Sequence, residues 1–159
     1  MKIAELLNLI LNDKKIQEPL EELKNYHKET YEHSLRVGLI CIKLGLKNNL
    51  SIEEIKLLGI SGLLHDLGKL DIPKDILNKN SSLNEKERKI IEGHSEKGFE
   101  RLKNFKEIKE IVEHHHKHQK KSYPHETNGI KKELCEIAQI IAVVDMFDAL
   151  SNKRVYKEK

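Results

Sequence analysis

The chain has 159 residues, of which 38% are hydrophobic and 35% charged, which is enough apolar material to bury the core of one domain. Its net charge of +3 comes from 29 basic and 26 acidic residues mixed along the chain, which argues against DNA binding and leaves a small anionic substrate open. No apolar run approaches the roughly 20 residues of a membrane span, and the N-terminal segment lacks a signal-peptide cleavage site. Two well-separated cysteines, Cys41 and Cys135, form no CxxC zinc motif, so we expect a cytoplasmic protein with reduced cysteines and no membrane contact.

The first half of the chain predicts three helices. Apolar residues within residues 3–11 recur at the spacing of an amphipathic helix. Pro19 is typical of the first position of a second helix, which we expect to reach about residue 47. Ser51 and Glu54 have capping-box spacing and open a third helix, which Gly68 is expected to end.

The second half predicts further helices and a polar loop. A turn and a short helical piece are expected over residues 72–78, followed by a helix that Asn84 and Glu87 cap and that extends to about residue 103. Two more helices are expected over residues 105–116 and 133–150, separated by a polar loop that contains Pro124 and Gly129. The sequence therefore predicts an all-α fold, a single helical bundle of about six to seven helices spanning residues 1–159.

The segment LLHDLGKLDIP, residues 63–73, places His65 and Asp66 at the end of an apolar run, where unpaired polar groups are costly. One interpretation is structural: Gly68 caps a helix in the left-handed conformation, Lys69 stabilises the negative helix end, and His65 bonds to a backbone carbonyl. The other interpretation is a metal site. The segment alone leaves both interpretations open.

Other predicted helices carry imidazoles and carboxylates that would suit a metal site. Glu29 and His33 are four residues apart and share a helix face, and Asp145 interrupts the most apolar stretch of the chain, where a carboxylate needs a cation or strong donors. His94, His114 and His115 lie on the helices between them. Helix bundles build metal sites in their cores from such side chains on facing helices, so we expect a metal site in the bundle core.

These residues occur in the order of a known family. His33, then His65 with Asp66, then Asp145 resembles the H…HD…D pattern of the HD-domain superfamily of metal-dependent phosphohydrolases. The segments HDLGKLDIPKDILNK, GHSEKG, IVEHHHKHQKKSYP and AVVDMFDALSNKRVYK resemble the HD-GYP branch, which degrades cyclic di-GMP, over about residues 26–157. The branch signature HHExxDGxGYP is replaced here by HHHKHQKKSYP, in which His116 stands for the glutamate and both loop glycines are gone.

The resemblance implies a role for each matching residue. Asp66 is implied to bridge two metal ions, Glu29 to serve a third ion, and Lys69 to contact the substrate phosphate. The implied metal ligands are Glu29, His33, His65, Asp66, His94, His114, His115 and Asp145. The implied substrate-binding residues are Lys69, Tyr123, Arg154 and Lys157. Two or three divalent ions are implied, iron or manganese first, with nickel, zinc, cobalt and magnesium as alternatives.

The implied reaction is hydrolysis of a phosphoester by a hydroxide that bridges two metal ions, with Asp66 and Lys69 as the catalytic residues. A cyclic dinucleotide such as cyclic di-GMP is the leading substrate. Two alternatives stay open: a nucleotide phosphomonoesterase, and a regulatory module that binds metal or nucleotide without turnover.

Several neighbouring residues receive structural interpretations. His114 and His115 are adjacent and point about 100° apart on a helix, so both could bind metal only where the helix ends. Solvated loop positions are expected for His116, His118 and His125, core packing for Cys41 and Met146, and a supporting ion pair for Arg36 with Asp148.

Overall fold

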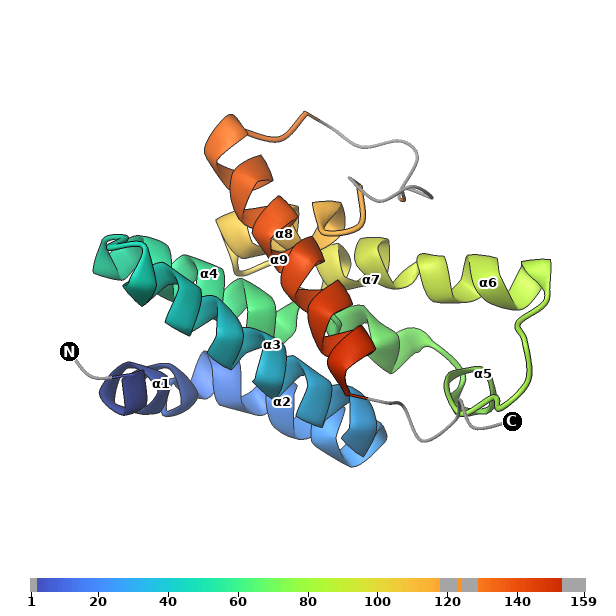
Figure 1. Ribbon diagram of the computed structural model, residues 1–159. Coiled ribbons are helices and arrows are strands. Elements are labelled where there is room, and N and C mark those ends of the chain that lie inside the picture. The colour runs from blue at the N-terminus through green and yellow to red at the C-terminus, as the bar shows by residue number, and fades with distance from the viewer. Residues whose placement is uncertain (1–2, 118–122, 124–128, 153–159) are drawn as a thin grey trace.

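The computed structural model describes residues 3–117, 123 and 129–152, and every regular element in these ranges is helical (Figure 1). The elements are α1 (Ile3–Leu11), α2 (Lys14–Tyr26), α3 (Lys28–Lys47), α4 (Ile52–Leu64), the 3₁₀ helix η1 (Leu67–Asp71), α5 (Lys74–Leu77), α6 (Glu85–Glu92), α7 (His94–Arg101), α8 (Lys106–His114) and α9 (Lys132–Ser151). The all-α prediction is confirmed. The described residues hold more helices than expected because two predicted helices are each divided and the turn after α4 is itself helical.

The helix predicted over residues 19–47 is in fact two helices that meet at His27. Asp13 caps the N-terminus of α2 by accepting a hydrogen bond from a first-turn amide at 3.0 Å, so Pro19 lies inside α2 instead of at its start. The backbone of His27 is extended, with φ −148° and ψ 94°. Its ring nitrogen Nδ1 accepts a hydrogen bond from the Thr30 amide at 3.2 Å, so His27 ends α2 and caps α3.

The helix predicted from Asn84 to about residue 103 is also two helices, α6 and α7, which meet at Gly93. The capping box is confirmed, since Asn84 and Glu87 each accept a hydrogen bond from the other's backbone amide, at 2.9 and 2.8 Å. His94 was expected in the middle of a helix and is instead the first residue of α7. Its side chain is buried in the bundle.

Glycines bring α3 and α4 into close contact. A Cβ atom at Gly38 would lie 2.5 Å from Cγ of Leu63, and one at Gly59 would lie 2.6 Å from a side chain of α3. The two backbones are therefore closer than larger residues would allow. This packing brings His33 on α3 and His65 at the end of α4 together, with ring centroids 5.2 Å apart.

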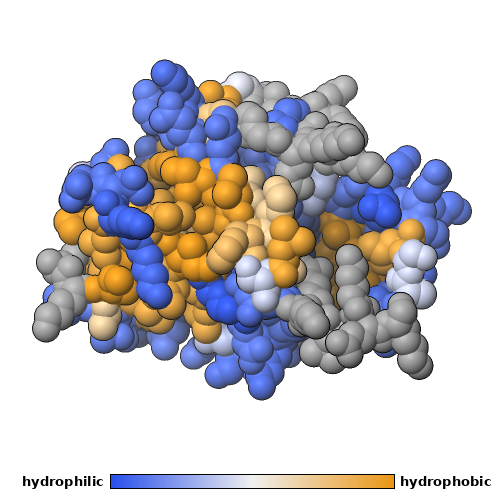
Figure 2. Space-filling model, in the orientation of Figure 1, coloured by the Kyte–Doolittle hydropathy of each residue, from blue (hydrophilic) through white to orange (hydrophobic). Residues whose placement is uncertain are grey.

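Helix α9 crosses the bundle in front of α3 and packs on α3 and α8 (Figure 1). The outer face of its C-terminal half is apolar as well as its inner face: Val143, Phe147 and Leu150 are exposed, and Figure 2 shows apolar surface in the middle of this view. Met146 is 49% exposed, so the prediction of core packing for it was wrong. A stretch that is apolar all round does not indicate which side faces the bundle. No helix in the described ranges is long and apolar enough to span a membrane.

Candidate metal centre

The first group of candidate ligands comes from three helical segments. Nitrogen or oxygen atoms of His33, His65 and Asp66 all lie within 4.8 Å of one another, and all three residues are buried. Asp145 on α9 adds a carboxylate, with Oδ1 3.1 Å from Nε2 of His33 and 3.9 Å from Nε2 of His65. The fold thus gathers the four residues of the H…HD…D pattern at one place, while their role as ligands stays a prediction.

The two imidazoles of this first group are oriented by hydrogen bonds from their other ring nitrogen. Nδ1 of His65 donates to the Gly62 carbonyl at 2.8 Å, and Nδ1 of His33 donates to Asp148 at 2.7 Å. Asp148 is held in turn by Arg36, as the expected ion pair, with Nε 2.8 Å from Oδ1. With the proton on Nδ1, each Nε2 presents a lone pair, and both Nε2 atoms are buried without a hydrogen-bond partner. Buried, unpartnered lone pairs facing carboxylates fit a metal ion.

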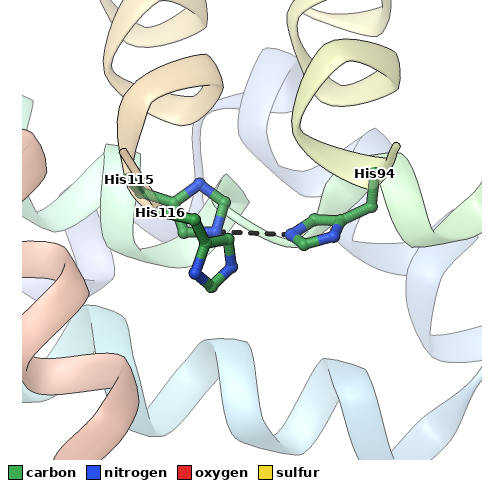
Figure 3. Close-up of side chains that lie close together, drawn as sticks. All are labelled: His94, His115 and His116. Atoms are coloured by element: carbon green, nitrogen blue, oxygen red, sulfur yellow. Dashed lines mark hydrogen bonds between the residues drawn. The ribbon is translucent and has the colours of Figure 1, made fainter. Parts of the chain in front are cut away.

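The second group consists of His94, His115 and His116, whose side chains converge in Figure 3. Nδ1 of His94 donates to the Ile91 carbonyl at 2.7 Å, and Nδ1 of His115 donates to the Val112 carbonyl at 2.5 Å. The Nε2 atoms of His94 and His115 then face each other at 3.3 Å with no proton between them. Two lone pairs at this distance repel unless a cation lies beside them, so this group also fits a metal ion.

Asp66 belongs to the first group and also faces the second. Its Oδ2 is 3.4 Å from Nε2 of His65 in the first group, and its Oδ1 is 3.4 Å from Nε2 of His94 in the second. Nζ of Lys69 donates to Oδ2 at 2.6 Å, so the lysine expected to contact the substrate phosphate is part of the same network. A carboxylate in this position can bind one ion with each oxygen.

Gly68 serves a purpose different from the one predicted. None of the described glycines has a positive φ, so Gly68 is not a left-handed helix cap. A Cβ atom there would lie 1.9 Å from the carbonyl oxygen of His94 and 2.5 Å from the amide nitrogen of Gly98. Only glycine lets η1 pass this close to α7, and the contact brings Asp66 next to His94.

Burial keeps most of these histidines uncharged. It lowers the pKa of His94 to about 3 and that of His116 to about 4, and it also lowers those of His65 and His115. Burial opposes charge on Asp66 too, but Lys69 and the neighbouring histidines together outweigh it and hold the pKa of Asp66 well below its usual range. Neutral imidazoles next to ionised carboxylates are the protonation states that bind divalent metals.

The low histidine pKa values predict that the metal-free protein loses stability in mild acid. Unfolding returns these imidazoles to a pKa of about 6.5, so below that pH the unfolded chain binds protons that the folded chain does not. The free energy of unfolding should then fall by about 1.4 kcal/mol per pH unit for each such histidine until the folded pKa is reached. His33 opposes the trend, because its contacts with Asp145 and Asp66 outweigh its burial and raise its pKa. Urea unfolding with a chelator at pH 7.0 and 5.5 tests this expectation, and equal midpoints would contradict it.

Other predicted site residues belong to neither group, and one of them lies beside the second. Glu29 is exposed, and it belongs to neither group. His114 is buried, but its Nδ1 donates to the Glu110 carbonyl at 2.8 Å and it belongs to neither group. Tyr123 lies beside the second group, with its ring stacked on His116 at a centroid distance of 4.5 Å. Arg154, Lys157, His118 and His125 are outside the described residues.

His116 is the residue whose place the sequence interpretation missed. It was expected in solvent, and the structure buries it among His94, His115 and Tyr123. The apolar face of α8 could have indicated this, because His116 follows the buried Val112 by four residues.

Comparison with known proteins gives the family. A family model described as an HD domain matches residues 16–159. A cyclic di-GMP phosphodiesterase of Pseudomonas aeruginosa is 31% identical over 145 residues, which are 87% of this chain and 34% of that protein. The 3'3'-cGAMP-specific phosphodiesterase 2 of Vibrio cholerae is 36% identical over 137 residues, 82% of this chain and 26% of that protein. A cyclic di-GMP phosphodiesterase of Thermotoga maritima is 31% identical over 150 residues, 89% of this chain and 40% of that protein. The chain therefore spans well under half of these relatives, and it belongs to the HD-domain family.

Proposed function

We propose that the chain is a metal-dependent phosphodiesterase that hydrolyses a cyclic dinucleotide. The observation that carries the proposal is the buried carboxylate of Asp66 between two groups of imidazoles whose Nε2 lone pairs face it. The names of the relatives support the substrate class, since they act on cyclic di-GMP or 3'3'-cGAMP. Localisation in the cytoplasm, where such nucleotides occur, belongs to the same proposal.

The residues divide the work of the reaction between them. Divalent ions bound by the two groups would lower the pKa of bound water and neutralise charge on the phosphoryl oxygens. Asp66 would hold the two binding positions at a fixed separation, and Asp145 would add negative charge to the first. Asp148 and Arg36 keep the ring of His33 oriented. Lys69 would bind a phosphoryl oxygen and stabilise its developing charge.

The donor sets limit the choice of metal. The first group mixes imidazole nitrogen with carboxylate oxygen, which suits iron or manganese, and nickel, zinc, cobalt or magnesium are alternatives. We infer about two ions per chain, one for each group. The exposed position of Glu29 gives no support to a third ion.

Turnover by metal-defined protein tests the function. Chain purified without metal and reloaded with Fe²⁺ or Mn²⁺ is incubated anaerobically with cyclic di-GMP, 3'3'-cGAMP, linear dinucleotides and nucleoside monophosphates, and the products are separated by chromatography. The proposal is supported if the chain opens the ring of a cyclic dinucleotide and a chelator abolishes this reaction. Release of inorganic phosphate from monophosphates alone would favour the phosphomonoesterase. Cyclic dinucleotide binding without hydrolysis under any metal would favour the regulatory module.

Lys69→Met should lower kcat by about 10²–10³-fold at saturating substrate and leave the metal content unchanged, because it removes a positioned donor and no metal ligand. If Lys69 acted only on the helix end, the change would cost at most about 1 kcal/mol of stability and leave kcat intact. Lys97→Met is the matched control, since Lys97 is a neighbouring lysine that donates to the Asp71 carbonyl at the surface. Rates, metal content and melting temperature are measured on the same samples.

A further inference from the structure

We propose that His116, and not His114, is the third imidazole of the second metal site, so that this site is richer in nitrogen than the first and takes a later transition metal. The inference rests on the proposed function only in assuming that the two groups bind metal. It departs from the family signature, which has a glutamate at the position of His116 when the motif is aligned on Tyr123 and Pro124.

The end of α8 decides which of the adjacent histidines faces the second group. The buried face of the helix carries Ile111 and Val112, and His115 and His116 each follow one of them by four residues. His114 instead follows Glu110 by four residues, and its Nδ1 donates to the carbonyl of that residue at 2.8 Å. The side chain of Glu113 lies 3.7 Å from the same nitrogen. The ring of His114 is therefore held on a different side of the helix end.

His116 has the contacts expected of a ligand. Its side chain is buried, with only 7% of the residue exposed, and Nδ1 has no hydrogen-bond partner. Its ring centroid lies 3.9 Å from that of His115 and 5.1 Å from that of His94, and the three rings each offer a nitrogen within 4.8 Å of the others. Tyr123 stacks on the ring at an interplanar angle of 30°, which fixes its orientation from the outside. A buried imidazole nitrogen without a partner is costly unless it binds a cation.

The two sites then differ in their donors. The first has His33 and His65 with carboxylates of Asp66 and Asp145, whereas the second has three imidazoles and shares one oxygen of Asp66. Carboxylate oxygen suits manganese, and imidazole nitrogen suits zinc, nickel and cobalt, which also bind more tightly in the Irving–Williams order. The donor sets therefore predict a mixed-metal centre when the later metal is limiting and manganese is in excess.

The adjacent histidines provide a matched pair of variants, His116→Asn and His114→Asn. Both proteins and the unchanged chain are stripped of metal and loaded with Co²⁺, and metal per chain and the visible absorption of cobalt are recorded, with circular dichroism as the control for folding. We expect about two cobalt ions in the unchanged chain and in His114→Asn, and about one in His116→Asn, with loss of one component of the spectrum. Addition of one equivalent of Zn²⁺ per chain with Mn²⁺ in large excess should load about one of each in the unchanged chain.

Two results would overturn the inference: His114→Asn loses an ion, or His116→Asn keeps both ions and the full spectrum. If His116→Asn does not fold, His116→Gln and Tyr123→Leu replace it. His116→Gln should lose the ion of the second group, and Tyr123→Leu should bind that ion more weakly. Failure here is distinct from failure of the proposed function. A chain that hydrolyses cyclic dinucleotides and keeps its second ion in His116→Asn would contradict only the ligand assignment. A chain whose second ion depends on His116 but that hydrolyses no phosphodiester would contradict only the function.

Discussion

Replacing Asp66 by asparagine should reduce phosphodiester hydrolysis by at least about 10³-fold and lower the metal content of the purified chain. The carboxylate faces His65 with one oxygen and His94 with the other, each at 3.4 Å. An asparagine amide keeps the shape of the side chain but has no charge and only one oxygen, so it cannot bind two ions. Initial rates at saturating substrate and metal content by mass spectrometry measure the two effects.

Asp71→Asn is the matched control for this substitution. Asp71 is in the same short segment as Asp66, but it pairs with Arg101 at the surface, with Oδ2 2.7 Å from Nε. The control should keep its metal and its rate. An Asp66→Asn protein that retained both ions and normal turnover would show that the carboxylate is not a shared ligand.

Gly68→Ala should disrupt both groups through the backbone. The new methyl group would meet the His94 carbonyl oxygen and the Gly98 amide nitrogen, which cannot move aside by changing rotamer. The segment η1 and the helix α7 must separate, at a cost of about 3 kcal/mol or more in the free energy of unfolding. That separation moves Asp66 away from His94, so the second ion should be lost even in protein that still folds. Urea unfolding with chelator and metal content after reloading measure the two consequences.

Gly93→Ala tests whether the effect belongs to this contact or to any change near His94. The backbone of Gly93 is in the right-handed helical region, and the nearest heavy atom to a Cβ there is 3.4 Å away. The free energy of unfolding of the Gly93→Ala variant should therefore change little. Equal stability and metal content in the two alanine variants would contradict the structural role assigned to Gly68.

The sequence predicts much of the first group, for physical reasons that are local. His33 lies on a long helix and shares one face with buried apolar residues, and Asp145 interrupts the most apolar stretch of the chain. Asp66 follows an apolar helix whose capping box marks its start. Polar groups at such places require partners, which is why the sequence indicates a metal site before any contact is known.

The second group was harder to predict because it depends on where helices end. A shift of one residue at the end of α8 exchanges His114 for His116, and a signature aligned on Tyr123 and Pro124 does not detect that shift. The break at Gly93 has no left-handed backbone to mark it, and His27 is an unusual capping residue. The sequence around Gly68 indicates a helix cap, whereas the constraint on Gly68 is a contact with α7. That contact involves residues about 30 positions later, so the local sequence does not indicate it.

The close packing of α3 and α4 should also limit how fast the first group of candidate ligands can open. His33 lies on α3 and His65 at the end of α4. If an ion is released by moving these two histidines apart, the contact between the helices must separate and Leu63 must leave the surface of Gly38. Opening of that kind exposes the centre of the core and approaches the free energy of global unfolding. The amides of α3 and α4 should therefore exchange with solvent more slowly than those of the other helices, and an ion in the first group should leave on the timescale of their exchange.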